Sequence, residues 1–235
     1  MVLTKRQEKI LDKIINEYIL SAVPVSSSLL NDKYNFDLSP ATLRIEMQRL
    51  TEQGFLCQPH TSAGRVPTDK GYRFFVDKVL NKGSNFKIKR RIAEEFKDLE
   101  NSLIFIQKAT KILADNSSNL GISYLSGENI LWKEGWEGIF EEPEFKDIDL
   151  VSKFTRLVNS LEEGIDELFS DDFLETRVFI GSENPFAKAD EFSLITSRLN
   201  FPKFQKEGIV AIIGPKRMNY RKNVSLVNLF NELLG

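Results

Sequence analysis

The residues best suited to chemistry in this sequence gather between positions 39 and 65. This segment carries cations at Arg44, Arg49 and Arg65, together with small hydroxyl side chains and the amide of Gln48. Cationic and small polar groups of this kind bind phosphate oxygens and fit the edges of base pairs. The segment therefore indicates recognition of a nucleic acid.

Residues that catalyse reactions or bind metals are scarce by comparison. The sequence has one histidine, His60, and one cysteine, Cys57, which is too few for a zinc, copper or iron–sulfur site. Paired acids such as Asp171 and Asp172 lie in charged runs typical of solvated surface, and neither G-x-x-x-x-G-K-[ST] nor G-x-G-x-x-G occurs. We expect no enzyme activity and no cofactor.

One helix must position most of the nucleic-acid-binding side chains. Ser39 and Pro40 supply an N-cap and a proline at the first helical position, and Gly54 ends the helix. An inward stripe is expected from the apolar residues Leu43, Met47 and Leu50. Ile45 falls on the outward side, where it either packs on a neighbouring segment or presses against a thymine methyl group.

A short hairpin follows this helix. Residues 55–57 and 65–66 read as strands, and residues 58–64 form a polar loop of small side chains between them. Two further helices are expected before the hairpin, the first opened by a Thr4-x-x-Gln7 capping box, and another follows Thr68. This order predicts a winged helix-turn-helix over residues 1–80, with the loop as its wing.

The predicted DNA contacts lie on the outward side of the helix and on the wing. They are Ser39, Ala41, Thr42, Arg44, Ile45, Gln48, Arg49, His60, Thr61, Ser62 and Arg65.

The distribution of charge favours the same end of the chain. Residues 1–91 contain 16 Lys+Arg against 9 Asp+Glu, whereas residues 92–235 contain 16 against 25. A basic first part joined to an acidic second part indicates that only the first part approaches a polyanion.

Composition restricts the class of protein. The chain has 235 residues with 41% hydrophobic and 28% charged side chains, which is typical of a globular protein of one or two domains. No run of about 18 apolar residues occurs, and the N-terminus lacks the layout of a secretory signal. We expect a cytoplasmic protein without a membrane partner.

A strict seven-residue repeat of apolar side chains follows the first domain. Its members are Ile92, Phe96, Leu99, Leu103, Ile106 and Leu113. Over residues 81–115 this repeat predicts a connecting helix, which either pairs two chains into a homodimer or packs against its own domain. Strands mixed with helices over residues 116–235 predict an α+β domain.

Several segments resemble one known family. Residues 39–47 and 58–73 resemble the winged helix of the heat-inducible transcription repressor HrcA of bacteria. Residues 178–185 and 214–220 resemble its GAF-like domain, and the comparison with the family implies that this domain is truncated here. The resemblance implies a homodimeric repressor of chaperone genes, acting on double-stranded DNA at an inverted-repeat operator, whose activity depends on the chaperonin.

Three features depart from the family pattern. Ile45 stands where members commonly carry Asn, and Ser28 replaces a common cation. The chain is also shorter than usual, and the insert that the family uses for dimerisation is not found. The alternative function is a winged-helix regulator that answers a small-molecule or protein signal rather than heat.

Overall fold

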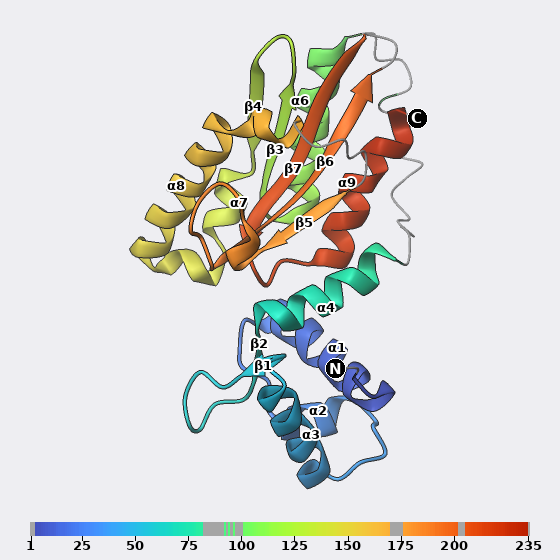
Figure 1. Ribbon diagram of the computed structural model, residues 1–235, viewed down its shortest axis with the longest axis vertical. Helices are drawn as coiled ribbons and strands as arrows, with labels where there is room; N and C mark the ends of the chain where they lie inside the picture. The colour runs from blue at the N-terminus through green and yellow to red at the C-terminus, as the bar shows by residue number, and fades with distance from the viewer. Residues whose placement is uncertain are drawn as a thin grey trace. The chain divides into compact units, whose positions relative to one another are not determined.

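A computed structural model describes most of the chain. The described residues are 3–81, 92, 94, 96, 101–169, 176–201 and 205–234. The chain divides into two compact units, Met1–Lys78 and Val79–Gly235 (Figure 1). Each unit has its own core.

The first unit begins with three helices, each started by a side-chain cap. They are α1 (Lys5–Ser21), α2 (Ser27–Lys33) and α3 (Pro40–Glu52). The predicted capping box of Thr4 and Gln7 is present, and the Ser26 and Ser39 hydroxyls accept hydrogen bonds from the backbone amides of Leu29 and Thr42. Each cap satisfies an amide that the helix itself leaves without a partner. The three predicted helices are confirmed.

A small antiparallel sheet completes this unit. Strands β1 (Leu56–Cys57) and β2 (Val66–Pro67) pair with each other, and α4 (Asp69–Leu80) follows. Val25 and Arg65 form an isolated bridge, which joins the end of the loop to the segment before α2. The core includes fully buried residues from α1, α3 and α4: Ile10, Leu11, Ile14, Ile15, Leu43, Leu50 and Val76.

The second unit is built on a five-stranded antiparallel sheet of order β4-β3-β7-β6-β5. The strands are β3 (Leu120–Leu125), β4 (Ile130–Glu134), β5 (Arg177–Ile180), β6 (Phe192–Phe201) and β7 (Lys206–Pro215). These strands lie within residues 116–235, where the sequence predicts strands mixed with helices. The described part of the chain has an α+β architecture, as predicted.

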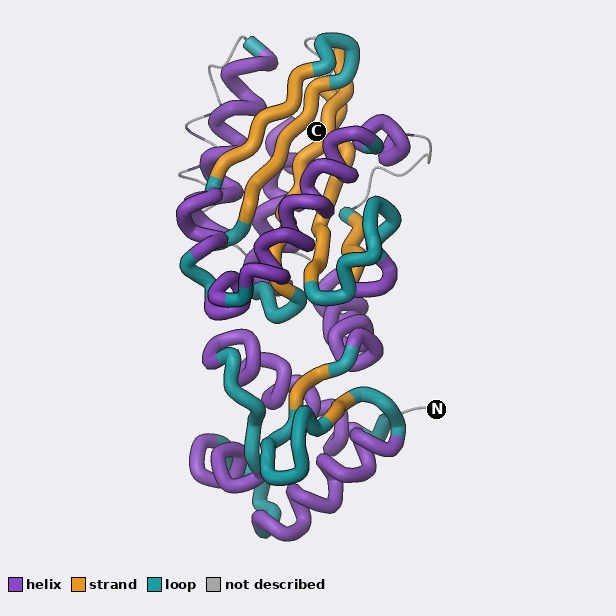
Figure 2. Tube along the Cα trace, turned by 90° about the vertical axis from the view of Figure 1, so that its left-hand side faces the viewer, coloured by secondary structure: helices purple, strands orange, loops and turns teal. Residues whose placement is uncertain are grey.

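Helices cover both faces of this sheet (Figures 1 and 2). One face packs on α6 (Ser102–Ser117) and α9 (Tyr220–Leu234), the other on α8 (Ile148–Glu163), α7 (Trp136–Phe140) and the short helix η1 (Pro143–Lys146). Alternate strand residues face each layer, so Ile122 packs toward α8 whereas Ser123 accepts a hydrogen bond from Thr110 of α6 at 2.7 Å.

The seven-residue repeat does not continue into α6 as one uninterrupted helix. Asn101 has an extended backbone, and its side chain caps the N-terminus of α6. Ile106 and Leu113 are fully buried within the second unit, and the ring of Phe96 lies 4.6 Å from that of Phe105. At these positions the repeat packs against its own domain. This is the second of the two arrangements that the sequence allows, the first being the pairing of two chains.

The other members of the repeat differ in their exposure. Ile92 is 3% exposed, Leu103 is partly exposed, and Leu99 lies outside the described residues. Within α6, the spacing of Leu103, Ile106 and Leu113 arises because the helix turns one apolar side toward the sheet and α9, which requires the same spacing as a short coiled coil.

Candidate nucleic-acid interface

Helix α3 presents the outward side that the sequence predicts. Leu43, Met47 and Leu50 are buried, whereas Ala41 and Ile45 are exposed. The exposed polar members of this side are Ser39, Arg44, Gln48 and Arg49, and Thr42 is partly exposed. Ile45 is 53% exposed, so it does not pack into the interior of the described chain.

Arg49 is held by a buried acid that the sequence analysis did not single out. Glu46 is 5% exposed, and one of its oxygens accepts a hydrogen bond from Arg49 Nη1 at 3.1 Å. Its other oxygen accepts one from Gln7 Nε2 at 3.2 Å, and Arg6 Nη1 lies 3.8 Å from the first oxygen. Buried charges require such partners, and these contacts join α1 to α3.

Arg65 also has a structural role. Its Nε donates to Thr51 Oγ1 at 3.1 Å and its Nη2 donates to Gln48 Oε1 at 3.0 Å, so the side chain ties the hairpin to α3. Gln48 in turn donates from Nε2 to Glu52 Oε1 at 3.1 Å. The two side chains are therefore ordered on the surface before any ligand arrives.

The loop between β1 and β2 is closed by its own hydrogen bonds. Gln58 Nε2 donates to the carbonyl oxygens of Thr61 at 2.8 Å and Ala63 at 2.9 Å, and the Ala63 amide donates to the His60 carbonyl at 2.9 Å. His60, Thr61 and Ser62 are exposed at its tip. The loop therefore presents its hydroxyls from a defined turn.

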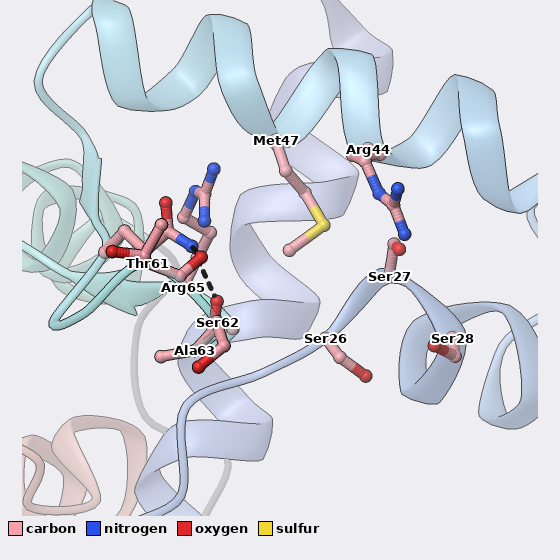
Figure 3. Close-up of a pocket in the computed structure, with 11 residues that line it drawn as sticks. Ser26, Ser27, Ser28, Arg44, Met47, Thr61, Ser62, Ala63 and Arg65 are labelled. Carbon is pink, nitrogen blue, oxygen red and sulfur yellow. Dashed lines mark hydrogen bonds between the residues drawn. The ribbon is translucent and has the colours of Figure 1, made fainter.

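A cavity of about 410 Å³ lies between this loop, α3 and the start of α2 (Figure 3). Arg44 and Met47 project from α3 toward it, with Ser26 and Ser27 on one side and Arg65 on the other. The remaining lining residues are Ser28, Gln58, Thr61, Ser62, Ala63 and Gly64. Arg44 has no hydrogen bond or ion pair to any residue that the structure describes, so its guanidinium is available to an anion.

The sequence analysis did not include the three serines among the contacts. Ser28 was noted only as the replacement of a common cation, and Ser26 caps α2. About 35 residues separate this segment from the loop that faces it, and the Val25–Arg65 bridge brings the two together. No local sequence pattern signals that contact.

The positive charge of the first unit is smaller than the sequence count suggested. Residues 1–78 contain 11 Lys+Arg against 9 Asp+Glu. The other five cations of the first 91 residues lie between positions 82 and 91, outside the described residues. The basic character of the interface is therefore local, because several acids of this unit are buried or paired.

Two observations bear on other classes of function. Within the described residues, no group of three or more His, Cys, Asp or Glu side chains is placed to hold a metal ion. A search of the same residues for helices long and apolar enough to cross a membrane finds none.

The fold and this surface define a class: a two-unit α+β protein whose first unit presents an arginine-bearing helix beside a hydroxyl-rich hairpin loop. The family model described as "HrcA protein C terminal domain" matches residues 72–224, which include the sheet of the second unit. The chain therefore belongs to the HrcA family.

Individual relatives agree with this assignment. The protein named "Heat-inducible transcription repressor HrcA" from Thermoanaerobacter sp. (strain X514) is 27% identical over 338 aligned positions, which cover 100% of this chain and 97% of the relative. A protein of the same name from Natranaerobius thermophilus is 57% identical over 82 residues, 35% of this chain and 24% of the relative. Because the first alignment has 338 positions and this chain 235 residues, roughly 100 positions of that relative have no counterpart here.

A solved structure shares the fold. The crystal structure of a protein described as hypothetical aligns with a TM-score of 0.77 at 21% identity and covers 99% of both chains.

Proposed function

We propose that this chain is a transcription repressor that binds double-stranded DNA through a winged helix-turn-helix in its first unit. One observation carries the proposal: α3 exposes Ala41, Arg44 and Ile45 together, next to a cavity lined by hydroxyls. Polar and small groups on an exposed helix can approach base edges in a major groove, while arginines and hydroxyls contact phosphates.

In this proposal α3 is the recognition helix and the β1–β2 loop is the wing. Ala41, Thr42, Ile45 and Gln48 approach the bases, and Ile45 offers an apolar surface to a thymine methyl group. A phosphate lies at the cavity, where Arg44 supplies charge. The backbone contacts of the wing come from its exposed residues His60, Thr61 and Ser62.

The regulatory part of the proposal comes from the relatives. They are named heat-inducible transcription repressors, so we propose that this chain represses stress-response genes in the cytoplasm from an inverted-repeat operator, as a homodimer. We propose that the second unit is GAF-like, despite the shorter chain, and that it is the part that responds to the chaperonin. Because Ile106 and Leu113 of the repeat are buried within the second unit, we propose that the dimer forms through another surface.

The test is to incubate the purified full chain with sheared genomic DNA of its source, then to sequence the retained fragments. Retained fragments that share an inverted repeat and lie upstream of chaperone genes support the proposal. Binding of one defined duplex should then weaken steeply as salt concentration rises, since phosphate contacts release counterions.

Two results would contradict parts of it. Retention of random DNA without a shared site would reject sequence-specific repression. A monomer in light scattering, with and without the selected duplex, would reject the homodimer.

A further inference from the structure

Helix α1 carries a row of cations that the interface described above does not include. Arg6, Lys9 and Lys13 are three and four residues apart, so they lie along one side of the helix. At 1.5 Å per residue the row is about 10 Å long. Arg6 and Lys9 are exposed, and Lys13 is partly exposed.

The first end of this row lies beside α3. Arg6 Nη1 and Arg49 Nη1 lie 3.8 and 3.1 Å from the same oxygen of Glu46. Both arginine side chains stay more than half exposed, at 56% and 57%. The single carboxylate balances only one of the two guanidiniums, so this end of the row keeps a net positive charge that faces solvent.

The other end lies beside the turn that precedes α3. Lys13 Nζ is 4.5 Å from the centroid of the Tyr34 ring, and Lys9 Nζ is 5.4 Å from that of Phe36. A cation–π contact orients an ammonium group without neutralising it. Two acids lie beside the row. Asp12 accepts a hydrogen bond from Asn16 Nδ2 at 3.1 Å, and Glu17, which interacts electrostatically with Lys13, accepts hydrogen bonds from Lys33 and Tyr34.

The row therefore runs along one flank of α3, and Arg44 stands on the opposite flank. At 3.6 residues per turn, Arg44 and Arg49 are about 140° apart around the helix, and the exposed Ile45 lies between them. A major groove about 12 Å wide has a phosphate strand on each side. A helix that enters the groove can therefore contact both phosphate strands if it has cations on both flanks.

We propose that Arg6, Lys9 and Lys13, together with Arg49, form a second phosphate-binding row. It contacts the strand on the other side of the major groove from the strand bound by Arg44 and the loop. This inference rests on the proposed function and adds α1 to the DNA-binding surface. Contacts of this kind add affinity and fix the register of α3, and they carry no base preference of their own.

The test compares the wild-type full chain with a variant carrying Arg6→Gln, Lys9→Gln and Lys13→Gln. Affinity for the selected duplex and for a scrambled duplex is measured by fluorescence anisotropy over a series of KCl concentrations. Removing one phosphate-binding cation lowers the slope of log K against log[salt] by about 1. We expect the slope to become shallower by about 3, equally on both duplexes.

A matched control removes three exposed lysines of the second unit. It carries Lys111→Gln, Lys146→Gln and Lys188→Gln, which change the net charge by the same amount. The control should keep the wild-type slope. An equal change in both variants would overturn the proposal, because it would reduce the effect to overall charge.

Two further variants separate charge from folding. Arg6→Lys keeps the charge and should keep the slope, and Lys9→Gln alone should lower it by about 1. A wild-type slope in Lys9→Gln and in the triple variant, with binding retained, would overturn the second row while the proposed function stands. Absence of salt-dependent DNA binding by the wild type would reject the function itself.

Discussion

Gly64 is the residue whose substitution should most directly test how the loop is attached to the first unit. A Cβ built at this position would lie 2.4 Å from the carbonyl carbon and oxygen of Val25 and 2.7 Å from the carbonyl carbon of Pro24. These neighbours are backbone atoms, which cannot rotate away as a side chain does. Gly64→Ala must therefore push the loop away from the segment before α2.

The cost follows from the hydrogen bonds between Val25 and Arg65. The Val25 amide donates to the Arg65 carbonyl at 2.9 Å, and the Arg65 amide donates to the Val25 carbonyl at 2.8 Å. A net contribution of about 0.5–1.5 kcal/mol from each bond gives a decrease of about 1–3 kcal/mol in the free energy of unfolding. The Arg65 side chain should also move from its position beside Thr51 and Gln48.

Urea denaturation of the full chain, followed by far-UV circular dichroism, measures this decrease. Amide hydrogen exchange at Val25 and Arg65 locates it. Gly138→Ala is the matched control, because no atom lies within 4 Å of its added Cβ, and alanine in a helix is neutral or stabilising by up to about 1 kcal/mol. Unchanged exchange at Arg65 in Gly64→Ala would refute the close packing at this glycine.

Three further predictions concern single side chains of the first unit. Arg44→Ala should weaken binding to the selected duplex by about 1–3 kcal/mol, measured by titrations at several salt concentrations. If the variant binds with wild-type affinity, our orientation of α3 is wrong. Ile45→Asn should change the preferred base more than the affinity, so identical sites selected from random duplexes by both proteins would contradict a base contact. Burial, with a hydrogen bond to Glu17, raises the pKa of Tyr34 from 10.0 to about 12. The contribution of neutral Tyr34 to the free energy of unfolding is therefore complete below pH about 10 and is lost as pH rises to about 12. Tyr34→Phe should remove this part of the loss of stability at high pH. Equal urea midpoints of the two proteins across this pH range would contradict the raised pKa.

Much of the first unit could be predicted from sequence because its signals are local. The Thr4–Gln7 capping box, the Ser39–Pro40 helix start and the apolar spacing of Leu43, Met47 and Leu50 depend on residues within one or two turns. The capping residues and the apolar spacing of a helix lie within the helix itself or next to it, so the sequence predicts where each helix begins and which side is buried.

The long-range polar contacts could not be predicted in this way. Glu46 lies on the buried side of α3, where a carboxylate is unexpected unless Gln7 and Arg49 are known to reach it. Arg65 was predicted to bind DNA, and the structure shows that its Nε and Nη2 already bond to α3. Hydrogen bonds between side chains tens of residues apart produce no periodic pattern in the sequence.

The seven-residue repeat left two alternatives open for a related reason. Apolar spacing specifies that one side of a helix is covered, and it does not specify by what. In the second unit the cover for Ile106 and Leu113 comes from the sheet and from α9, which lies more than a hundred residues later in the chain. A sequence window of three heptads contains no information about that partner.

These contacts also suggest how α3 can serve recognition. A helix that reads bases must keep its orientation, because small displacements change which edges its side chains reach. Glu46 joins α3 to α1, and Arg65 joins it to the hairpin, so its two flanks are fixed by different elements. Between these flanks α3 exposes the small or apolar Ala41 and Ile45, and Arg44 has no partner among the described residues. This division of polar residues between anchoring and recognition explains why Arg65 is held against α3 by its own hydrogen bonds, whereas Arg44 makes none with a described residue.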